Sequence, residues 1–186
     1  MTLILASASP RRKELLSRIT SDFIVVPSLG DEPTDGPPRE RALSSARAKA
    51  HDVSERHSGV IIGADTVVVL EGDVFVKPES RSDARRMLER LRGREHVVIT
   101  GLCVVSTWSG EERTAVEETH VRFRELSAEE IADYLATGEG DDKAGAYGIQ
   151  GRAALLIDHI RGDVYNVMGL PLCRLVLLLR EVGVRV

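Results

Sequence analysis

Apolar runs of strand length alternate with helical segments along the first third of this chain. The runs at 2–6 and 23–27 are each followed by a helical segment, at 10–19 and from Pro38 onward. Parallel strands need a crossover of about this length, which is usually a helix. The alternation therefore predicts an α/β fold.

Two hairpins interrupt this alternation. Residues 59–76 are rich in Val and Ile and contain the turn signal EGD, and residues 96–108 and 113–126 flank a second turn, SGEE. Hairpin strands are antiparallel, so we expect a mixed, strongly twisted β-sheet flanked by helices rather than a purely parallel one. A chain of 186 residues favours a single domain spanning 1–186, with the hairpins forming a second lobe.

Net charge, hydropathy and cysteine spacing limit the partners and the compartment that we expect for this protein. The net charge is -4, so the molecule as a whole is not a nucleic-acid-binding polycation, and any anion site must be local. No apolar run reaches the ~18 residues of a membrane span. Cys103 and Cys173 lie in apolar surroundings without zinc-site spacing, which predicts two buried, reduced thiols. We expect a cytoplasmic protein with no membrane and no nucleic-acid partner.

The first helix begins with an unusual charge pattern. Ser9 is a suitable N-cap and Pro10 a suitable first residue, but Arg11 and Arg12 then occupy the first turn. Cations there oppose the helix dipole, whereas an anion bound at the turn would reverse the interaction. The alternative is a solvated pair of arginines, one of them paired with Glu14 or another carboxylate.

Three further stretches carry polar residues in unusual places. Asp65 interrupts an apolar strand, so it is either paired, bound to a metal or at a strand end. Lys77 follows a strand and precedes a proline; it is either a phosphate ligand or a solvated lysine. The loop after the second strand is acidic, and it suits Mg²⁺ binding or simple solvation; its carboxylates are Asp31, Glu32 and Asp35.

A glycine-dense loop precedes the final strand, which we expect over residues 154–160. Gly145, Gly148 and Gly151 would let backbone approach a ligand closely, and the amide of Gln150 could read the edge of a base. The spacing matches neither the Walker nor the Rossmann motif, and a long turn is the alternative. Phosphate-binding cations, carboxylates and a base-reading amide together favour a nucleotide site with a metal.

The motifs LASASPRRKELL, GADTVV…KP, EHVVITGL and DKAGAYGIQG…GDVYNVMGLPL resemble the Maf family of nucleoside triphosphate pyrophosphatases. The resemblance implies a fold like that of the inosine triphosphatases, with a cleft between two lobes. It also implies a divalent cation (Mg²⁺ or Mn²⁺) and a homodimer. ADT, RR and GIQG are similar to the branch that hydrolyses dTTP and UTP. Val76 stands where many members have glycine before the lysine.

The resemblance also assigns roles by position. It implies that Asp65 is catalytic, as proton acceptor or metal ligand, and that Glu32 is a partner of the metal or water. It implies phosphate-binding roles for Ser7, Arg11, Lys49 and Lys77, and substrate specificity for Arg12, Thr66 and Gln150.

The reaction implied is hydrolysis of dTTP and UTP, or of modified pyrimidine nucleotides, to the monophosphate and pyrophosphate. Water would attack the α-phosphorus, with the metal neutralising developing charge. A free aspartate is a weak base at neutral pH, which favours a metal-assisted water with Asp65 as ligand or orienting base. The alternative is a non-catalytic regulator of septum formation or cell division that acts through a protein or nucleic-acid partner.

Overall fold

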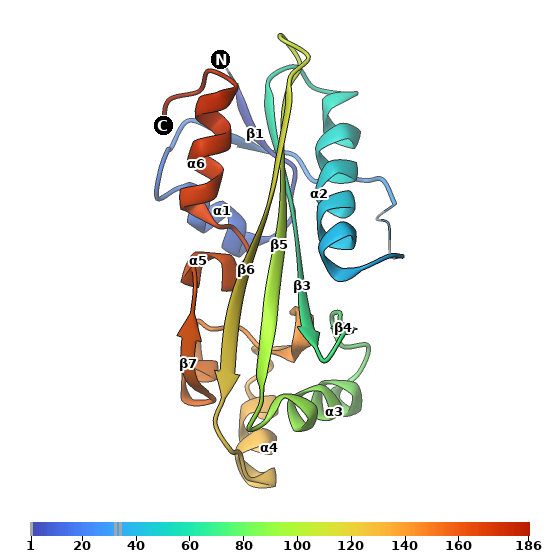
Figure 1. The fold of residues 1–186 in the computed structure, drawn as a ribbon, viewed down its shortest axis with the longest axis vertical. Coiled ribbons are helices and arrows are strands. Elements are labelled where there is room, and N and C mark those ends of the chain that lie inside the picture. Colours follow the sequence, from blue (N-terminus) through green and yellow to red (C-terminus); the bar gives the residue numbers. More distant parts are fainter. Residues whose placement is uncertain (1, 32, 34) are drawn as a thin grey trace. The chain divides into compact units, whose positions relative to one another are not determined.

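A seven-stranded sheet runs through the computed structural model, which describes residues 2–31, 33 and 35–186. The strand order is β2-β1-β3-β5-β6-β7, and β4 pairs with β3 off this path (Figure 1). The strands are β1 (Leu3–Leu5), β2 (Ile24–Val25), β3 (Val60–Leu70), β4 (Asp73–Phe75), β5 (Glu95–Ser106), β6 (Glu112–Phe123) and β7 (Ile157–Arg161).

The sheet combines parallel and antiparallel pairing. β1 pairs in parallel with both β2 and β3, and Ile4 lies between Ile24 and Ile61. β3 pairs antiparallel with β4, and β6 pairs antiparallel with β7. The mixed α/β sheet expected from the two hairpins is therefore confirmed.

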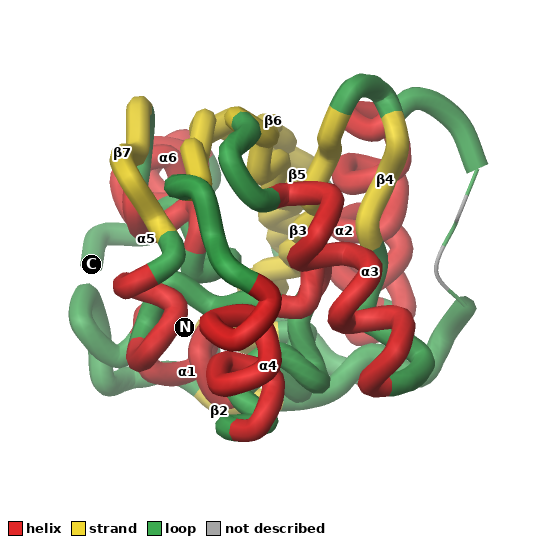
Figure 2. The backbone as a smooth tube through the Cα atoms, turned by 90° about the horizontal axis from the view of Figure 1, so that it is seen from below, coloured by secondary structure: helices red, strands yellow, loops and turns green. Residues whose placement is uncertain are grey.

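Helices and short 3₁₀ turns connect the strands (Figure 2). The helices are α1 (Pro10–Leu16), α2 (Pro38–Ser54), α3 (Arg81–Leu91), α4 (Ala128–Ala136), α5 (Val164–Val167) and α6 (Leu172–Glu181), and the 3₁₀ turns are Ala144–Ala146 and Gly151–Leu155. Among the described residues, none of these helices combines the length and apolar character that crossing a membrane requires.

Several element ends differ from the prediction for local reasons. α1 ends at Leu16 rather than 19, because the hydroxyl of Ser17 donates to the carbonyl of Glu14 and draws the chain into a turn. β2 holds only two residues and stops before Pro27. The final strand begins at Ile157, because the residues before it form a 3₁₀ turn.

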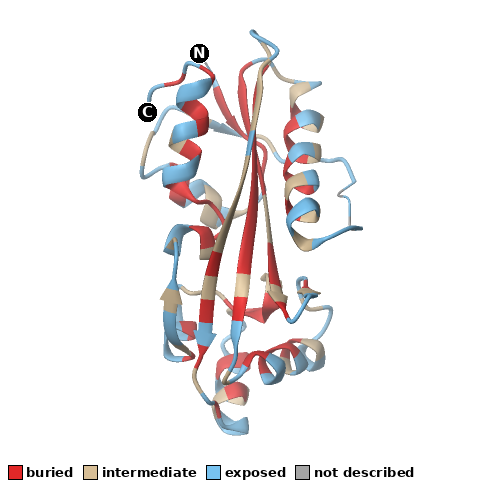
Figure 3. Cartoon of the chain, in the orientation of Figure 1, coloured by how far each residue is buried: buried red, intermediate tan, exposed pale blue. Residues whose placement is uncertain are grey.

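The chain divides into two compact units. The first unit contains Met1–Thr66, Thr100–Glu117 and Gly169–Val186, and the second contains Val67–Ile99 and Glu118–Met168. Each unit has buried residues of its own along the strands that pass through it (Figure 3).

In the first unit, α2 lies directly against the backbone of two strands. A Cβ at Gly63 of β3 would stand 2.1 Å from the carbonyl oxygen of Ala46, and one at Gly101 of β5 would stand 2.3 Å from that of Ala42. Real Cβ atoms do not approach so closely, so only glycine fits at these positions. The close contact sets the distance between α2 and β3, which carries several of the predicted site residues.

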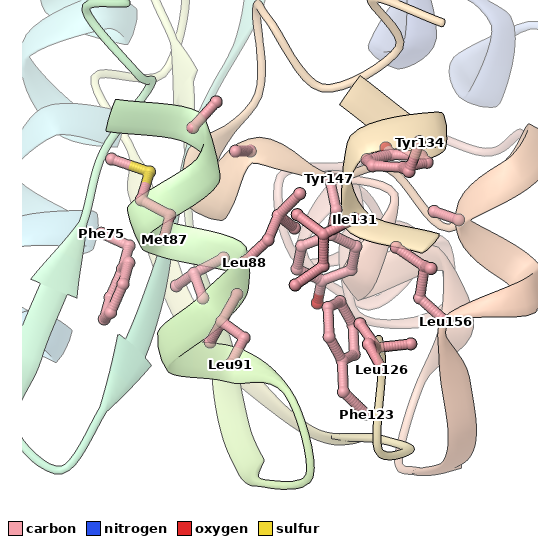
Figure 4. Packing of buried hydrophobic residues seen from close by; sticks show 14 of the residues in the cluster. Phe75, Met87, Leu88, Leu91, Phe123, Leu126, Ile131, Tyr134, Tyr147 and Leu156 are labelled. Carbon is pink, nitrogen blue, oxygen red and sulfur yellow. The ribbon is translucent and has the colours of Figure 1, made fainter. Parts of the chain in front are cut away.

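The second unit has a core built around α3 and α4, which pack side by side (Figure 4). His96, Phe123 and Tyr147 meet edge to face in this core, with ring centroids 4.8 to 5.4 Å apart. Such edge-to-face contacts are favourable beyond the area that they bury.

One of the two cysteine predictions is wrong. Cys103 is buried in β5, where burial raises the pKa of its thiol to about 12, but Cys173 is exposed on α6. Cys173 and the exposed Leu177 are four residues apart, so they share the outer face of the helix, while Leu175 and Leu179 face the core.

Candidate functional site

A buried ion pair joins α2 to β3. The ammonium of Lys49 donates to Oδ1 of Asp65 over 2.7 Å, and the two side chains are only 11% and 17% exposed. Asp65 follows a fully buried stretch of β3, and it lies two residues beyond Gly63, on the same face of the strand. The close approach of α2 at Gly63 therefore brings Lys49 within reach of Asp65.

The pairing makes the Asp65 carboxylate tolerable at this depth. A charge taken out of water is costly unless a partner and hydrogen bonds compensate it. Lys49 meets that need and also fixes the orientation of the carboxylate. Lys49 is thus a direct partner of Asp65.

Arg12 is the centre of a second polar group in the same unit. The hydroxyl of Ser9 accepts from the backbone N–H of Arg12 at 3.5 Å, as expected for the N-cap of α1. The Arg12 guanidinium donates to the carbonyl of Gly169 at 2.8 Å, to the hydroxyl of Thr66 at 3.1 Å and to that of Ser7 at 3.5 Å. These acceptors compensate a charge that the helix dipole alone disfavours.

The backbone conformation of Gly169 shapes the turn that offers this carbonyl. Its φ is +104°, a conformation that favours glycine, so a side chain at this position would be strained. An added Cβ would make only ordinary contacts, at 3.7 Å from Nε of Arg12 and 3.5 Å from Oγ1 of Thr66. The turn before α6 is therefore part of the support for Arg12.

The Arg12 group extends into β5 through Thr100. The hydroxyl oxygens of Thr66 and Thr100 are 2.9 Å apart, and Thr100 is fully buried. The sequence reasoning missed Thr100, although a polar residue within the apolar stretch HVVITGLCVV is the same kind of signal that singled out Asp65.

Two predicted site residues, Lys77 and Gln150, belong to the second unit, and both are exposed. Lys77 follows β4, and Gln150 precedes a 3₁₀ turn. The backbone N–H of Gly145 donates to the carbonyl of Val76 at 3.2 Å, and the φ of Gly145 is +71°. This bond ties the glycine-dense loop to the segment that carries Lys77.

A buried His–Tyr pair lies beneath the same loop. The hydroxyl of Tyr147 is 2.7 Å from Nε2 of His96, and the hydroxyl of Tyr134 accepts from the N–H of Gly148 at 3.3 Å. Burial lowers the pKa of His96 to about 4, although the charge of Glu95 opposes the shift. Burial also raises the pKa of Tyr147. Both side chains are neutral at physiological pH.

Of the remaining predicted site residues, the structure describes Arg11 but not Glu32. Arg11 lies half-buried in the first turn of α1, as expected from its position. Glu32 lies outside the described residues, and Asp31 and Asp35 on either side of it are exposed. Within the part of the chain that the structure describes, no three His, Cys, Asp or Glu side chains are grouped closely enough to hold a metal ion by themselves.

The fold and these groups define an α/β protein with a buried aspartate–lysine pair and an arginine–threonine network around its central strand. A family model described as Maf-like protein matches residues 2–182, and the chain belongs to this family.

The relatives are similar over almost their full length. The chain is 51% identical over 184 residues to a protein of Thermococcus gammatolerans named dTTP/UTP pyrophosphatase, covering 99% of this chain and 98% of the relative. It is also 51% identical over 184 residues to a protein of the same name from Symbiobacterium thermophilum, covering 97% and 94%.

Among solved structures, the Staphylococcus aureus Ham1 protein aligns over 66% of this chain and 72% of its own, with a TM-score of 0.48 and 14% identity.

Proposed function

We propose that this protein is a nucleoside triphosphate pyrophosphatase that hydrolyses dTTP and UTP to the monophosphate and pyrophosphate. The observation that carries the proposal is the 51% identity to a relative named dTTP/UTP pyrophosphatase over 98% of that relative's length. The buried Lys49–Asp65 pair supports it, because it holds a carboxylate ready at a partly enclosed position. Residues 1–186 act as one catalytic domain, in the cytoplasm and as a homodimer.

The reaction divides the triphosphate at one bond. Water attacks the α-phosphorus, and the bond to the oxygen that bridges to the β-phosphate breaks, so that pyrophosphate leaves. Because Lys49 holds Oδ1 of Asp65, the other oxygen of this carboxylate orients the attacking water or takes its proton. Phosphate oxygens are held by Ser7, Arg11, Lys49 and Lys77, whose charges and hydroxyl match an anion.

The donor set fits a divalent cation that enters with the substrate. Mg²⁺ is usually held by one or two carboxylates together with substrate phosphates, rather than by a cage of protein ligands. Asp65 offers one such carboxylate, and the described residues form no larger ligand cluster. When bound, Mg²⁺ or Mn²⁺ would supply charge neutralisation at the phosphate oxygens and a lower pKa for the attacking water. Glu32 is the second carboxylate that we assign to this ion.

Selectivity for the base is assigned to Arg12, Thr66 and Gln150. Thr66 is only half-buried and is held by Arg12, so its hydroxyl is a fixed polar group rather than a mobile one. Gln150 is exposed on its loop, where its amide both donates and accepts.

The test is pyrophosphate release from a panel of nucleoside triphosphates with Mg²⁺ or Mn²⁺. We expect dTTP and UTP to be the best substrates and Asp65→Asn to lose activity by at least about a hundredfold, the scale of a positioned acid–base group. Glu14→Gln is the matched control, because it removes an exposed carboxylate that pairs with Arg18. If the wild-type protein releases no pyrophosphate from any triphosphate, the proposal is wrong and a binding role replaces it.

A further inference from the structure

Thr100 is a buried hydroxyl with a direct connection to Thr66. It lies in β5, is fully buried, and its Oγ1 is 2.9 Å from Oγ1 of Thr66. A hydroxyl at this depth needs hydrogen-bond partners, and a valine of nearly the same shape would need none. Packing alone therefore does not explain why a threonine stands at this position.

The hydroxyl of Thr66 has a limited number of hydrogen-bonding positions. It has one hydrogen to donate and two lone pairs that accept. Arg12 only donates, so its contact with Thr66 at 3.1 Å occupies a lone pair. The contact with Thr100 occupies either the other lone pair or the hydrogen. Whether the Thr66 hydroxyl can donate to a ligand or accept from it therefore depends on which of the two threonines donates.

Both partners of Thr66 are held in place. Arg12 is fixed by the carbonyl of Gly169 at 2.8 Å. Thr100 precedes Gly101, where β5 lies so close to α2 that a Cβ would stand 2.3 Å from the carbonyl of Ala42. Threonine also has a stiff χ1 angle. These contacts hold the oxygen of the Thr66 hydroxyl in one position, and the direction of its hydrogen bond with Thr100 decides whether it can donate to a ligand or accept from one.

We propose that Thr100 is a positioning residue for base selectivity: it donates its hydroxyl hydrogen to Thr66, so that Thr66 can only donate to the base. This inference rests on the proposed function. Thymine and uracil carry a carbonyl at position 4, which accepts a hydrogen bond, whereas cytosine carries an amino group there, which donates. A hydroxyl that can only donate therefore accepts dTTP and UTP and discriminates against dCTP and CTP.

The experiment compares kcat/KM for dTTP and dCTP in the wild-type enzyme, Thr100→Val and Thr100→Ser. In Thr100→Val, the second lone pair of Thr66 becomes available to the cytosine amino group. We expect the dTTP/dCTP ratio to fall by about three- to tenfold, which is the range that one hydrogen bond provides. Thr100→Ser keeps the hydroxyl, and we expect its ratio to stay within about twofold of the wild type.

Thr119→Val is the matched control. Thr119 is likewise fully buried, but it lies in the second unit, where its hydroxyl bonds Asp163 and Asn166. We expect this variant to lower the melting temperature while leaving the dTTP/dCTP ratio unchanged. A purely structural role of Thr100 would produce the same result in Thr100→Val, with both substrates slowed equally.

The outcomes separate the two proposals. A wild-type ratio in Thr100→Val overturns the role of Thr100 while the proposed function stands. No turnover of either substrate by the wild-type enzyme overturns the proposed function itself. If Thr100→Val does not fold, Thr100→Ala also lacks the hydroxyl and has a smaller side chain, and its dTTP/dCTP ratio decides.

Discussion

Asp65 and Thr66 are consecutive residues of β3, and their side chains project from opposite faces of the sheet: Asp65 meets Lys49 of α2, and Thr66 meets Arg12 of α1. Successive residues of a strand point to opposite faces, so the separation is a property of the backbone. The proposed catalytic carboxylate and the proposed selectivity hydroxyl are thus supported by different helices. We expect the two functions to respond separately to mutation.

The Lys49–Asp65 pair predicts a double-mutant cycle in stability. Lys49→Met leaves a largely buried carboxylate without this partner, and breaking buried pairs typically costs about 3–5 kcal/mol in free energy of unfolding. Lys49→Met combined with Asp65→Asn removes both charges and should be less destabilised than Lys49→Met alone. Urea unfolding of the wild type, Lys49→Met, Asp65→Asn and the double variant measures this. If the losses in free energy of unfolding are strictly additive, the two residues are not coupled.

We expect even the conservative replacement of Arg12 by lysine to impair the protein. Arg12→Lys keeps the charge, but an ammonium cannot reach the three acceptors that the planar guanidinium serves together. We expect a lower selectivity for dTTP over purine triphosphates and a loss of about 1–2 kcal/mol in unfolding free energy. Arg18→Lys, just beyond α1, is the control, since its pairing with Glu14 is exposed. Equal effects in both variants would argue against a special role of Arg12.

Gly63→Ala is predicted to disturb the site without touching a polar group. Its Cβ would stand 2.1 Å from the carbonyl of Ala46, so α2 must move away from β3 and draw Lys49 from Asp65. We expect a loss of about 1–3 kcal/mol in stability, the usual cost of overpacking, together with a lower kcat. At Gly30 an added Cβ meets Asp52 at an ordinary 3.4 Å, so Gly30→Ala should leave both quantities near wild type.

His96 makes stability dependent on pH. Its pKa is about 4 in the folded state and near 6.5 when unfolded, so between these values the unfolded chain binds the extra proton. Stability is therefore full above pH 6.5 and falls as the pH drops toward 4, by about 3 kcal/mol. The measurement is urea unfolding from pH 7 to pH 4, with His96→Phe as comparison. If the free energy of unfolding of His96→Phe depends on pH as steeply as that of the wild type, His96 is not the cause of the dependence.

Gln150→Ala should weaken the preference for dTTP and UTP over purine triphosphates. The Gln150 side chain is exposed, so we expect the melting temperature to stay near wild type. The relative kcat/KM values of dTTP and dGTP measure the change. An unchanged ratio would remove Gln150 from base recognition.

A local signal in the sequence predicted the start of the first helix. Ser9 caps α1 as predicted, and the structure shows caps of the same local kind at Ser80 of α3 and in the Ser127–Glu130 capping box of α4. These bonds join residues at most three apart, so the sequence alone contains both partners. The mixed sheet could be predicted for a similar reason, because the turn signals of the two hairpins are local.

Features that depend on distant segments could not be predicted. The position of Arg12 depends on a carbonyl 157 residues away, and the partner of Thr66 in β5 is 34 residues away. The pairing of Lys49 with Asp65 follows from how closely α2 lies on β3, which one strand glycine permits. The burial of Cys173 was predicted wrongly, because its apolar neighbours in the sequence lie on both the buried and the exposed face of α6.

Because Cys173 is exposed and Cys103 is buried, the native chain can be labelled selectively at one thiol. Cys103 is enclosed in β5 and holds its proton tightly, while Cys173 stands exposed on α6, four residues after the Gly169 carbonyl that accepts from Arg12. A thiol-directed fluorophore or a ¹⁹F label will therefore attach at Cys173 without any cysteine first being removed by mutation. The spectroscopic signal would then report directly on the side of the molecule that supports Arg12 as a nucleotide binds.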